Sequence, residues 1–398
     1  MENATMYAQR RARLLESLDT NPVVLTAFTA MQQTNDSAAP FVQESNFFYL
    51  TGIVEPDWKL LLTGDGSWLI APSKTDIQRI FDGGMSNEEA EAISGISNFL
   101  TEKQYTDELS LLAEKHSSVY TVLKHPHSSY FDFSLNPAPQ KTIKKLKLVF
   151  KEVVDCRRNL SKLKAIKTDE EIQLIQKAID ISIEGFIAVK NQLQAAEYEY
   201  QLEATLSYEF RSRGAEGHAY TPIVGAGINA CTLHYVANKD KLPTNGMVLI
   251  DAGAKVGEYA SDITRTYAVG VPSAREKAVH GEVEKAQKAI IELIQPGVRL
   301  EDYQKQSDEI MRTALVNLDL IKKPSDFQRY FPHAVSHGLG IDVHDSLGGF
   351  ETFQPGMVLT VEPGIYITEE KIGVRIEDDI LVTEQGAINL SGKLPTSL

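Results

Sequence analysis

The sequence predicts two domains: an α/β domain over residues 1–155 and an α+β domain over residues 156–398, in which helices pack on a pseudo-symmetric antiparallel sheet. Three observations lead to this prediction. The chain has 398 residues, whereas one domain usually holds about 100–200. Strand-like and helix-like segments alternate before residue 155. From Met247 onward the order is hairpin, two helices, hairpin, and such a repeated order indicates a layered α+β unit.

The first domain begins with strand-like segments. "PVVLTAF" (22–28) and "FFYLTGI" (47–53) are rich in β-branched and aromatic residues, and both are expected to be strands. "WKLLLTGDGSWLIAP" (58–72) predicts a hairpin that turns at residues 64–66, "GDG". "NEEAEAISGI" and "TDELSLLAEKH" have helical composition, and "SSVYTVL", close behind them, is a further strand candidate. His125 and His127 in "KHPHSS" are expected to be loop residues.

The stretch "DCRRNLSKLKAIK" (155–167) is polar and basic, and it is interpreted as the linker between the domains. The helix predicted after it starts at a capping box, because Thr168 can accept a backbone hydrogen bond while Glu171, three residues later, reaches back. Ile175, Ile179 and Ile183 then recur at helical spacing. The second domain is therefore expected to open with a long amphipathic helix.

Composition excludes two classes of partner and indicates a location. The formal net charge is −14 and no basic stretch stands out, which argues against nucleic acid and against an anionic membrane surface. No apolar run approaches the ~18 residues of a membrane span, and the N-terminal "MENATMYAQRRARLLESLDT" lacks the apolar block of a signal peptide. Cys156 and Cys231 form no C-x-x-C pair, so a reducing, cytoplasmic location is expected.

Four acidic residues stand inside or at the ends of hydrophobic strands, where carboxylates are seldom buried unpaired. They are Asp251 after "VLI", Asp262 before "ITRT", Glu362 after "VLTV" and Glu377 after "VRI". The first two are 11 residues apart and the last two 15, and both midpoints fall in turn-like sequence. Residues at odd separation can pair directly in a hairpin, so each hairpin is expected to aim two carboxylates at one spot unless a bulge intervenes.

Four facing carboxylates repel one another, and burying each of them without a compensating charge costs several kcal/mol. Two divalent cations would balance the four negative charges, and carboxylates with imidazole but no thiolate suit Mn, Fe, Co or Zn. Two metal ions that share bridging carboxylates can also activate a water for hydrolysis. Any one of these acids could instead be a turn residue, an edge-strand residue or a surface ion pair, but that interpretation does not account for all four together.

Three of the nine histidines lie in "HAVSHGLGIDVHD" (333–345), as His333, His337 and His344. Their spacing would place them on one face of a helix, but Gly338 and Gly340 interrupt the run and "IDVH" alternates like a strand. His337, just before the glycines, is the candidate metal ligand. His333 and His344 are candidates for proton handling or substrate binding.

Two further candidates carry a weaker signal. His234 in "ACTLHYVAN" stands 17 residues before Asp251, and a structural loop histidine is the alternative interpretation. Arg375 lies two residues before Glu377, so the two side chains share a strand face. The arginine could orient that carboxylate, bind substrate or form an ordinary salt bridge.

Taken together, these segments resemble the ordered motifs of the pita-bread metallopeptidases, which include methionine aminopeptidase, prolidase and Xaa-Pro aminopeptidase. The likeness covers about residues 160–398 and rests on "DAG" with "SDITRT", "SHGLGIDVHD", "TVEPGIY" and "VRIEDD". "FVQESNFFYLTGIVEPD" (41–57) resembles the N-terminal domain of Xaa-Pro aminopeptidases, which methionine aminopeptidase lacks. Those enzymes often have a bulky aromatic residue after the "SH" histidine, where this chain has Gly338.

The resemblance implies a pita-bread catalytic domain that holds two divalent metal ions, usually Mn or Co, with Zn and Fe as alternatives. Its metal ligands would be Asp251 on one ion, Asp262 and Glu377 bridging both, and His337 and Glu362 on the second. Substrate-binding or catalytic roles would fall to His234, His333, His344 and Arg375. Members of the family are commonly dimers or tetramers, so a homodimer or homotetramer is expected.

The resemblance also implies an exopeptidase that releases the N-terminal residue from peptides with proline in second position. A metal-bridging hydroxide would attack the scissile carbonyl, Glu362 would carry the proton to the leaving nitrogen, and His344 and His234 would position the tetrahedral intermediate. The nearest alternative is prolidase, which cleaves only Xaa-Pro dipeptides with the same ligands. A non-catalytic peptide-binding relative, or a creatinase-like hydrolase without metal, would not need the five ligands that this chain retains.

Overall fold

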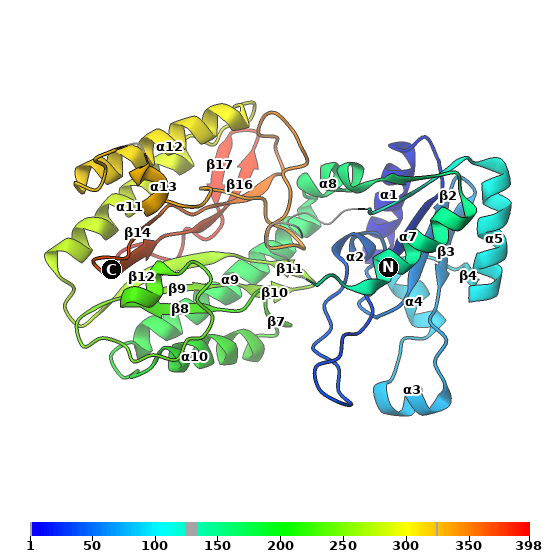
Figure 1. The fold of residues 1–398 in the computed structure, drawn as a ribbon, viewed down its shortest axis with the longest axis horizontal. Helices are drawn as coiled ribbons and strands as arrows, with labels where there is room; N and C mark the ends of the chain where they lie inside the picture. Colours follow the sequence, from blue (N-terminus) through cyan, green and yellow to red (C-terminus); the bar gives the residue numbers. More distant parts are fainter. Residues whose placement is uncertain (1, 124–133, 324) are drawn as a thin grey trace. The chain divides into compact units, whose positions relative to one another are not determined.

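The computed structural model describes residues 2–123, 134–323 and 325–398, and the chain divides into two compact units, residues 1–163 and 164–398. The first unit is α/β and the second is α+β with antiparallel strands, so the predicted fold class is confirmed (Figure 1). His125 and His127, which were expected in a loop, lie outside the described residues. Every helix in the described ranges is too short or too polar to cross a membrane.

The first unit is built on a six-stranded sheet in the order β4-β3-β2-β1-β5-β6. Its strands are β1 (Val23–Thr26), β2 (Lys59–Thr63), β3 (Gly66–Ile70), β4 (Phe99–Leu100), β5 (Ser118–Thr121) and β6 (Glu152–Asp155). Its helices are α1 (Glu2–Glu16), α2 (Ser45–Thr51), α3 (Asp76–Asp82), α4 (Asn87–Ser94), α5 (Glu102–Lys115) and α7 (Pro137–Val149). Buried Val24, Leu61, Leu109 and Leu146 form part of a core that joins the sheet to α5 and α7.

The hairpin predicted over residues 58–72 is confirmed as β2 and β3, with Thr63 paired to Gly66 across the turn. The strand predicted over residues 47–53 is wrong, because these residues belong mainly to helix α2. Glu44 caps this helix by accepting a bond from the Phe47 amide at 2.6 Å, and Gly52, with φ +71°, ends it. Its residues from 46 to 51 are all buried, so the helix has no polar face that would distinguish it from a strand.

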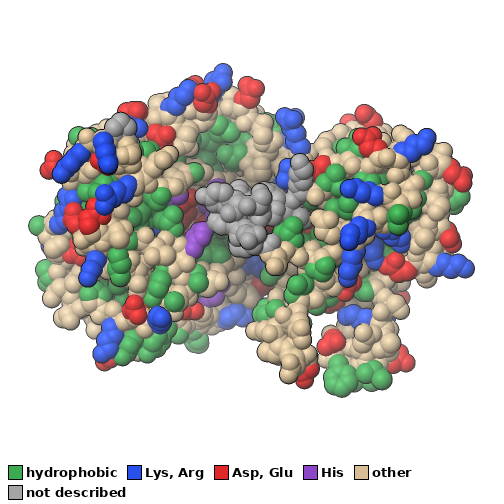
Figure 2. Space-filling model, viewed as in Figure 1, with side chains coloured by type: hydrophobic (Ala, Val, Ile, Leu, Met, Phe, Trp, Pro, Cys, Tyr) green, Lys and Arg blue, Asp and Glu red, His purple; other side chains and the backbone are tan. Residues whose placement is uncertain are grey.

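Helix α3 exposes an apolar surface that the first unit does not cover. It has no buried residue, and Ile77, Ile80 and Phe81 are 67%, 81% and 80% exposed. Figure 2 shows these hydrophobic side chains gathered at the tip of the unit. A contiguous exposed apolar patch on a folded protein is typical of a contact surface.

The polar stretch predicted as a linker forms helix α8 (Arg157–Ala165), and the division between the compact units falls inside it. Helix α9 (Asp169–Gln192) follows and confirms the predicted capping box. The Thr168 amide donates to the Glu171 carboxylate at 3.0 Å, and the Glu171 amide donates to the Thr168 hydroxyl at 3.4 Å. Ile175, Ile179 and Ile183 are buried, as the helical spacing predicts.

The second unit has the predicted order of hairpin, two helices and hairpin. Its first part holds α10 (Glu199–Ser212), β7 (Gly217–His218), β8 (Ile223–Ala226), the 3-10 helix η1 (Gly227–Cys231), β9 (Gly246–Ala252), β10 (Ala254–Val256), β11 (Tyr259–Ala260) and β12 (Ile263–Val269). The connecting helices are α11 (Ala274–Glu292), α12 (Leu300–Asn317) and the short α13 (Asp326–Tyr330). Its last part holds β13 (Val358–Val361), β14 (Gly364–Ile367), β15 (Ile372–Arg375), β16 (Asp378–Thr383) and β17 (Gly386–Asn389).

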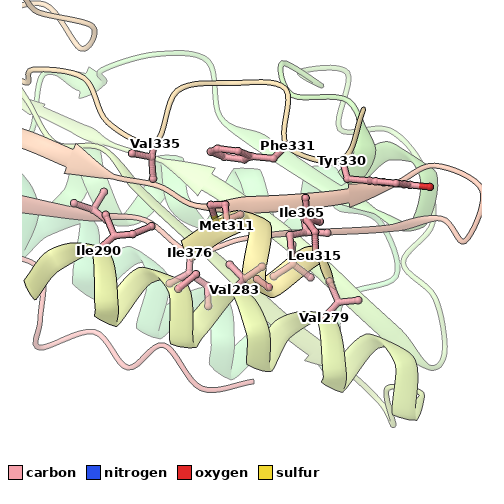
Figure 3. Packing of buried hydrophobic residues seen from close by; sticks show 14 of the residues in the cluster. Val279, Val283, Ile290, Met311, Leu315, Tyr330, Phe331, Val335, Ile365 and Ile376 are labelled. Carbon is pink, nitrogen blue, oxygen red and sulfur yellow. The ribbon is translucent and has the colours of Figure 1, made fainter. Parts of the chain in front are cut away.

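The core of the second unit lies between its connecting helices and its last strands. Figure 3 shows Val279, Val283 and Ile290 of α11 pointing toward Ile365 of β14 and toward Ile376. All five are fully buried. Burying such a side chain stabilises the fold by about 1.5–3 kcal/mol. The core therefore supports the strands of the last hairpin rigidly, and these strands carry polar residues on the face away from the core.

Candidate metal centre

The first hairpin brings Asp251 and Asp262 to one face. Asp251 of β9 pairs with Thr264 of β12, and the strands turn at Gly257 and Glu258, which have φ angles of +56° and +67°. The turn therefore lies one residue beyond the midpoint that the spacing predicts, and Asp262 sits diagonally from Asp251 instead of directly opposite. Because Asp262 and Thr264 are two residues apart, their side chains still point to the same side as Asp251.

The second hairpin holds Glu362 and Glu377 directly opposite each other, as the spacing predicts. They lie between two paired stretches, β13 with β16 and β14 with β15, that share one register. An isolated bridge pairs Glu377 with Thr264, whose carbonyl accepts the Glu377 amide at 3.0 Å. Thr264 thus stands next to Asp251 in one hairpin and next to Glu377 in the other, which joins the two pairs of carboxylates.

The acids and two histidines converge in three overlapping clusters. In each cluster the potential ligand atoms all lie within 4.8 Å of one another. The clusters are Asp251 with Asp262 and Glu377, His337 with Glu362 and Glu377, and Asp262 with His337 and His344. All five predicted metal-ligand side chains are therefore brought together, and Glu377, Asp262 and His337 each belong to two clusters.

Burial and mutual repulsion strongly disfavour the charged forms of these acids. Burial, followed by the neighbouring carboxylates, raises the pKa of Asp262 and of Glu377 well above the ordinary range. Burial and then Glu377 raise the pKa of Glu362 in the same way. A cluster of partly compensated carboxylates with imidazole is a donor set that fits divalent metal ions, because the ions supply the missing positive charge.

His337 directs a neutral ring nitrogen toward these carboxylates. Its Nδ1 lies 3.0 Å from the Gly338 carbonyl, so Nδ1 carries the proton and Nε2 keeps its lone pair. Nε2 lies 3.5 Å from Asp262 and 3.4 Å from Glu362. Burial, and then His344, lower the pKa of His337 to about 3. The ring is therefore uncharged near neutral pH, as a metal ligand must be.

The loop that carries His337 is held by the second hairpin. The Thr360 amide donates to the His337 carbonyl at 2.9 Å, and the His337 amide donates to the Thr360 hydroxyl at 3.2 Å. Gly338 pairs with Asp345 and Leu359, and a Cβ on it would lie 2.8 Å from the Asp345 carbonyl oxygen. Residues 333–345 form no helix, so the prediction that these histidines do not share a helix face is confirmed. The strand expected from "IDVH" is wrong, because residues 340–344 bend back so that Asp345 pairs with Gly338.

His333 joins the site through a chain of hydrogen bonds. Its Nδ1 donates to the Ala334 carbonyl at 2.8 Å, so its Nε2 accepts from the Tyr366 hydroxyl at 2.9 Å. That hydroxyl in turn accepts from Arg375 at 2.8 Å. Burial, and then Arg375, lower the pKa of His333 to about 4, so this ring is also neutral near pH 7. Its Nδ1 lies 3.6 Å from Glu362.

Arg375 is buried and bonds Asp251, not the Glu377 carboxylate two residues along its own strand. Its guanidinium donates to Asp251 at 2.5 Å, to the Thr264 hydroxyl at 3.1 Å and to Tyr366. Of the roles considered for Arg375, the geometry shows a salt bridge, and its partner is Asp251. The carboxylate that the guanidinium bonds belongs to β9, a strand of the first hairpin.

His344 and His234 lie at the more open side of the site. The His344 ring is 4.3 Å from the His337 ring, centroid to centroid, and both His344 and His234 are exposed. Figure 2 shows histidine side chains gathered on this face of the second unit. An electrostatic interaction with His234 is the smallest contribution to the lowered pKa of His333, so His234 lies within electrostatic range of the site.

The sequence patterns missed Tyr220 and Tyr366. The Tyr220 hydroxyl lies within hydrogen-bond distance of Asp251 and, at 2.5 Å, of Asp262. It has one proton, so it serves one carboxylate at a time. "HAYTP" carries no strand or cap signal near Tyr220, and only its place beside β7 brings it to the acids. Tyr366 stands two residues after Gly364 in the "PGIY" motif, and its position on β14 could have indicated it.

Two family models match the chain. The model of metallopeptidase family M24 matches residues 173–384, and the model of the aminopeptidase P N-terminal domain matches residues 7–120. The M24 match contains every residue of the three clusters.

Relatives match along the whole length. The Xaa-Pro aminopeptidase of Haemophilus influenzae is 31% identical, over 98% of this chain and 95% of that protein. Xaa-Pro aminopeptidase 3 of Rattus norvegicus is 33% identical, over 98% of this chain and 83% of that protein. The solved structure of Escherichia coli aminopeptidase P with the inhibitor Pro-Leu has a TM-score of 0.86 and 28% identity, and the match covers 99% of this chain and 96% of that one.

Removing metal is predicted to destabilise the protein more at high pH than at low pH. Glu362, Asp262 and Glu377 have raised pKa values in the folded chain, so they hold protons that the unfolded chain has already released. Their contribution is therefore favourable at low pH and is lost as the pH rises through the folded-state values. Metal ions replace these protons, so the melting-temperature gain on adding Mn²⁺ to stripped protein should grow from about pH 5 to about pH 8. A gain that shrinks over this range would contradict the prediction.

Proposed function

The chain belongs to metallopeptidase family M24 and is a metal-dependent aminopeptidase, and we propose that it releases the N-terminal residue before proline by means of two metal ions. We assign residues 1–155 to the N-terminal domain and residues 156–398 to the catalytic domain, which the two family matches support. The observation that carries the proposal is that all five proposed ligands lie in overlapping clusters, within each of which the ligand atoms are less than 4.8 Å apart. The substrates proposed are peptides that begin Xaa-Pro.

Asp251, Asp262 and Glu377 would hold one ion, and Asp262, Glu377, His337 and Glu362 the other, so that two acids are shared. Four carboxylates balance two divalent ions in formal charge, and the set of hard oxygen donors with one imidazole suits Mn²⁺, with Co²⁺, Fe²⁺ and Zn²⁺ as alternatives. Bound metal would supply a water of lowered pKa and a Lewis acid for the scissile carbonyl.

Glu362 would move the proton. Its side chain is 16% exposed, whereas those of Asp262 and Asp251 are 6% and 11% exposed, so it has the best access to substrate. A carboxylate placed beside the attacking water can act as a general base and then as a general acid. Glu362 would take the proton of the attacking water and deliver it to the nitrogen that leaves with proline.

The remaining polar groups would bind and orient the peptide. His344 and His234 lie at the open side and would position the oxygen that becomes charged in the transition state. His333 is held by Tyr366 and faces Glu362, so it would position the residue that follows the scissile bond. Arg375 would orient Asp251, near the place where the free amino terminus binds.

Prolidase has the same ligands, and the aminopeptidase is favoured by the whole-length match to proteins named Xaa-Pro aminopeptidase. A non-catalytic peptide-binding role is disfavoured because the donor set is complete. Two free thiols, Cys156 and Cys231, support a reducing, cytoplasmic location. The exposed apolar face of α3 supports assembly as a homodimer or homotetramer.

Replacing Glu362→Gln is predicted to lower kcat by about 10²–10⁴-fold, because the amide cannot carry the proton. The folded state and most of the bound Mn²⁺ should remain. Steady-state hydrolysis of an Xaa-Pro tripeptide measures kcat. Glu369→Gln is the matched control, because Glu369 is exposed on the turn between β14 and β15, where it pairs with Arg329. Near-full activity of the Glu362 variant would rule out its proposed role.

In the presence of added Mn²⁺, an Xaa-Pro-Yaa tripeptide is predicted to be hydrolysed with a kcat/KM at least about 10-fold above that of the matching Xaa-Pro dipeptide. Release of the first amino acid is followed by chromatography. A clear preference for the dipeptide would replace the aminopeptidase assignment by a prolidase.

Replacing Phe81→Asp is predicted to shift the purified protein toward a smaller species, because a charge on the exposed face of α3 opposes its burial against another copy. Sedimentation velocity at several concentrations measures the species. Asp82→Asn at the end of the same helix serves as the control. An unchanged assembly would show that α3 is not part of the contact.

A further inference from the structure

His234 lies on a segment with little regular structure of its own. After β8 ends at Ala226, the chain forms η1 and then continues without helix or strand up to β9, which begins at Gly246. His234 is exposed in the middle of this segment. A side chain on a loop can contact a bound peptide at a defined distance only if other residues hold the loop in place.

One buried carboxylate supplies those contacts. Glu199, the first residue of α10, is fully buried, and each of its oxygens accepts two hydrogen bonds. One oxygen accepts from the Ala226 amide at 3.0 Å and from the Asn229 side chain at 3.1 Å. The other accepts from the Tyr235 hydroxyl at 2.8 Å and from the Asp240 amide at 3.0 Å.

These four donors come from the beginning, the middle and the end of the loop, and all are uncharged. Burying a carboxylate without a bonded cation is costly, and four well-placed donors offset that cost. Tyr235 is the direct neighbour of His234, so the bond from its hydroxyl fixes the backbone on the C-terminal side of the histidine. The Glu199 carboxylate therefore binds both ends of the loop and also Tyr235, the residue next to His234.

The other side of the loop rests on the strand that carries Arg375. A Cβ at Gly373 of β15 would lie 2.1 Å from the Ala230 carbonyl oxygen, so η1 packs directly on this strand. Ala230 and Tyr366 belong to one buried hydrophobic cluster, and Tyr366 bonds both His333 and Arg375. These contacts fix the position of the loop relative to His333 and Arg375, which we place around the substrate.

We propose that Glu199 is a positioning residue, which holds the loop of residues 226–240 so that His234 is presented to the substrate. The inference rests on the proposed role of His234 in binding or stabilising the reacting peptide. Glu199 itself makes no contact with the metal-binding side chains, and its contribution to catalysis would pass through His234 alone.

The test is a double-mutant cycle of Glu199→Gln with His234→Ala, measured as kcat and KM for an Xaa-Pro tripeptide with Mn²⁺. The glutamine keeps the shape but turns one acceptor into a donor that faces N–H and O–H groups. Glu199→Gln should lower kcat/KM by about 10- to 100-fold in wild-type background, as a displaced catalytic group does. In the His234→Ala background, the same substitution should change kcat/KM by less than about twofold, because no histidine is left to displace.

The controls separate positioning from general destabilisation. Glu209→Gln on the same helix, whose carboxylate pairs with Arg213, should leave kcat/KM unchanged. Tyr235→Phe removes one of the four bonds and should lower kcat/KM in the same direction by a smaller factor, which keeps the test available if Glu199→Gln does not fold. Hydrogen exchange of residues 226–240 should increase in both variants, while the Mn²⁺ content should stay at the wild-type value.

A double variant that falls by the product of the two single losses would overturn the proposal, as would single variants with wild-type kcat/KM. In both cases the wild-type chain remains active, so the proposed function stands. A wild-type chain without activity on Xaa-Pro peptides would overturn the proposed function and the positioning role together, and the two failures are thereby distinguished.

Discussion

Four carboxyl groups lie within a few ångströms of one another, three of them buried and that of Glu362 16% exposed, and the rest of the second unit must compensate their charge. Without compensation, each buried negative charge would oppose folding by about several kcal/mol. Arg375 compensates Asp251, whereas burial and the neighbouring carboxylates raise the pKa values of Asp262 and Glu377 well above the ordinary range. The same imbalance that makes the site costly in the metal-free chain would favour the binding of divalent cations.

The antiparallel pairing of the two hairpins turns this demand into a defined geometry. Register places Glu362 opposite Glu377, and the bridge between Glu377 and Thr264 attaches the second pair of acids to the first. Behind the bridge, Arg265 is buried and donates to the Glu377 carbonyl and to Asp378, each at 2.6 Å. The strand that carries Glu377 is thus held by a satisfied polar network on one side and by the apolar core under α11 on the other, so the metal-binding side chains have little freedom to move apart.

Local patterns predicted the parts of this structure that local rules control. The spacing of Glu362 and Glu377 predicts the observed register of the second hairpin, although Lys371 in its turn has a φ of +58°. The first turn has φ > 0 at Gly257 and at Glu258 and lies one residue beyond the predicted midpoint, and a glutamate gives no signal of that conformation. Residues 47–53 were assigned to a strand because a fully buried helix shows no polar face. Patterns of single segments likewise could not indicate Tyr220 or Glu199, since their partners lie 31 and 27 or more residues away. The candidate metal ligands could be predicted from the sequence because each acid interrupts an apolar strand. The roles of those residues are part of the proposal.

The central claim is that the carboxylates and His337 form a site for two metal ions, and metal stoichiometry tests it most directly. Calorimetric titration of stripped protein with Mn²⁺, checked by elemental analysis after dialysis, counts the ions per chain. The account predicts two ions per chain in the wild-type protein and a loss of one tightly held ion in His337→Ala, since His337 belongs to the cluster with Glu362 and not to the one with Asp251. A wild-type chain that binds a single ion at saturation, or a His337 variant that still holds two with unchanged affinity, would contradict it.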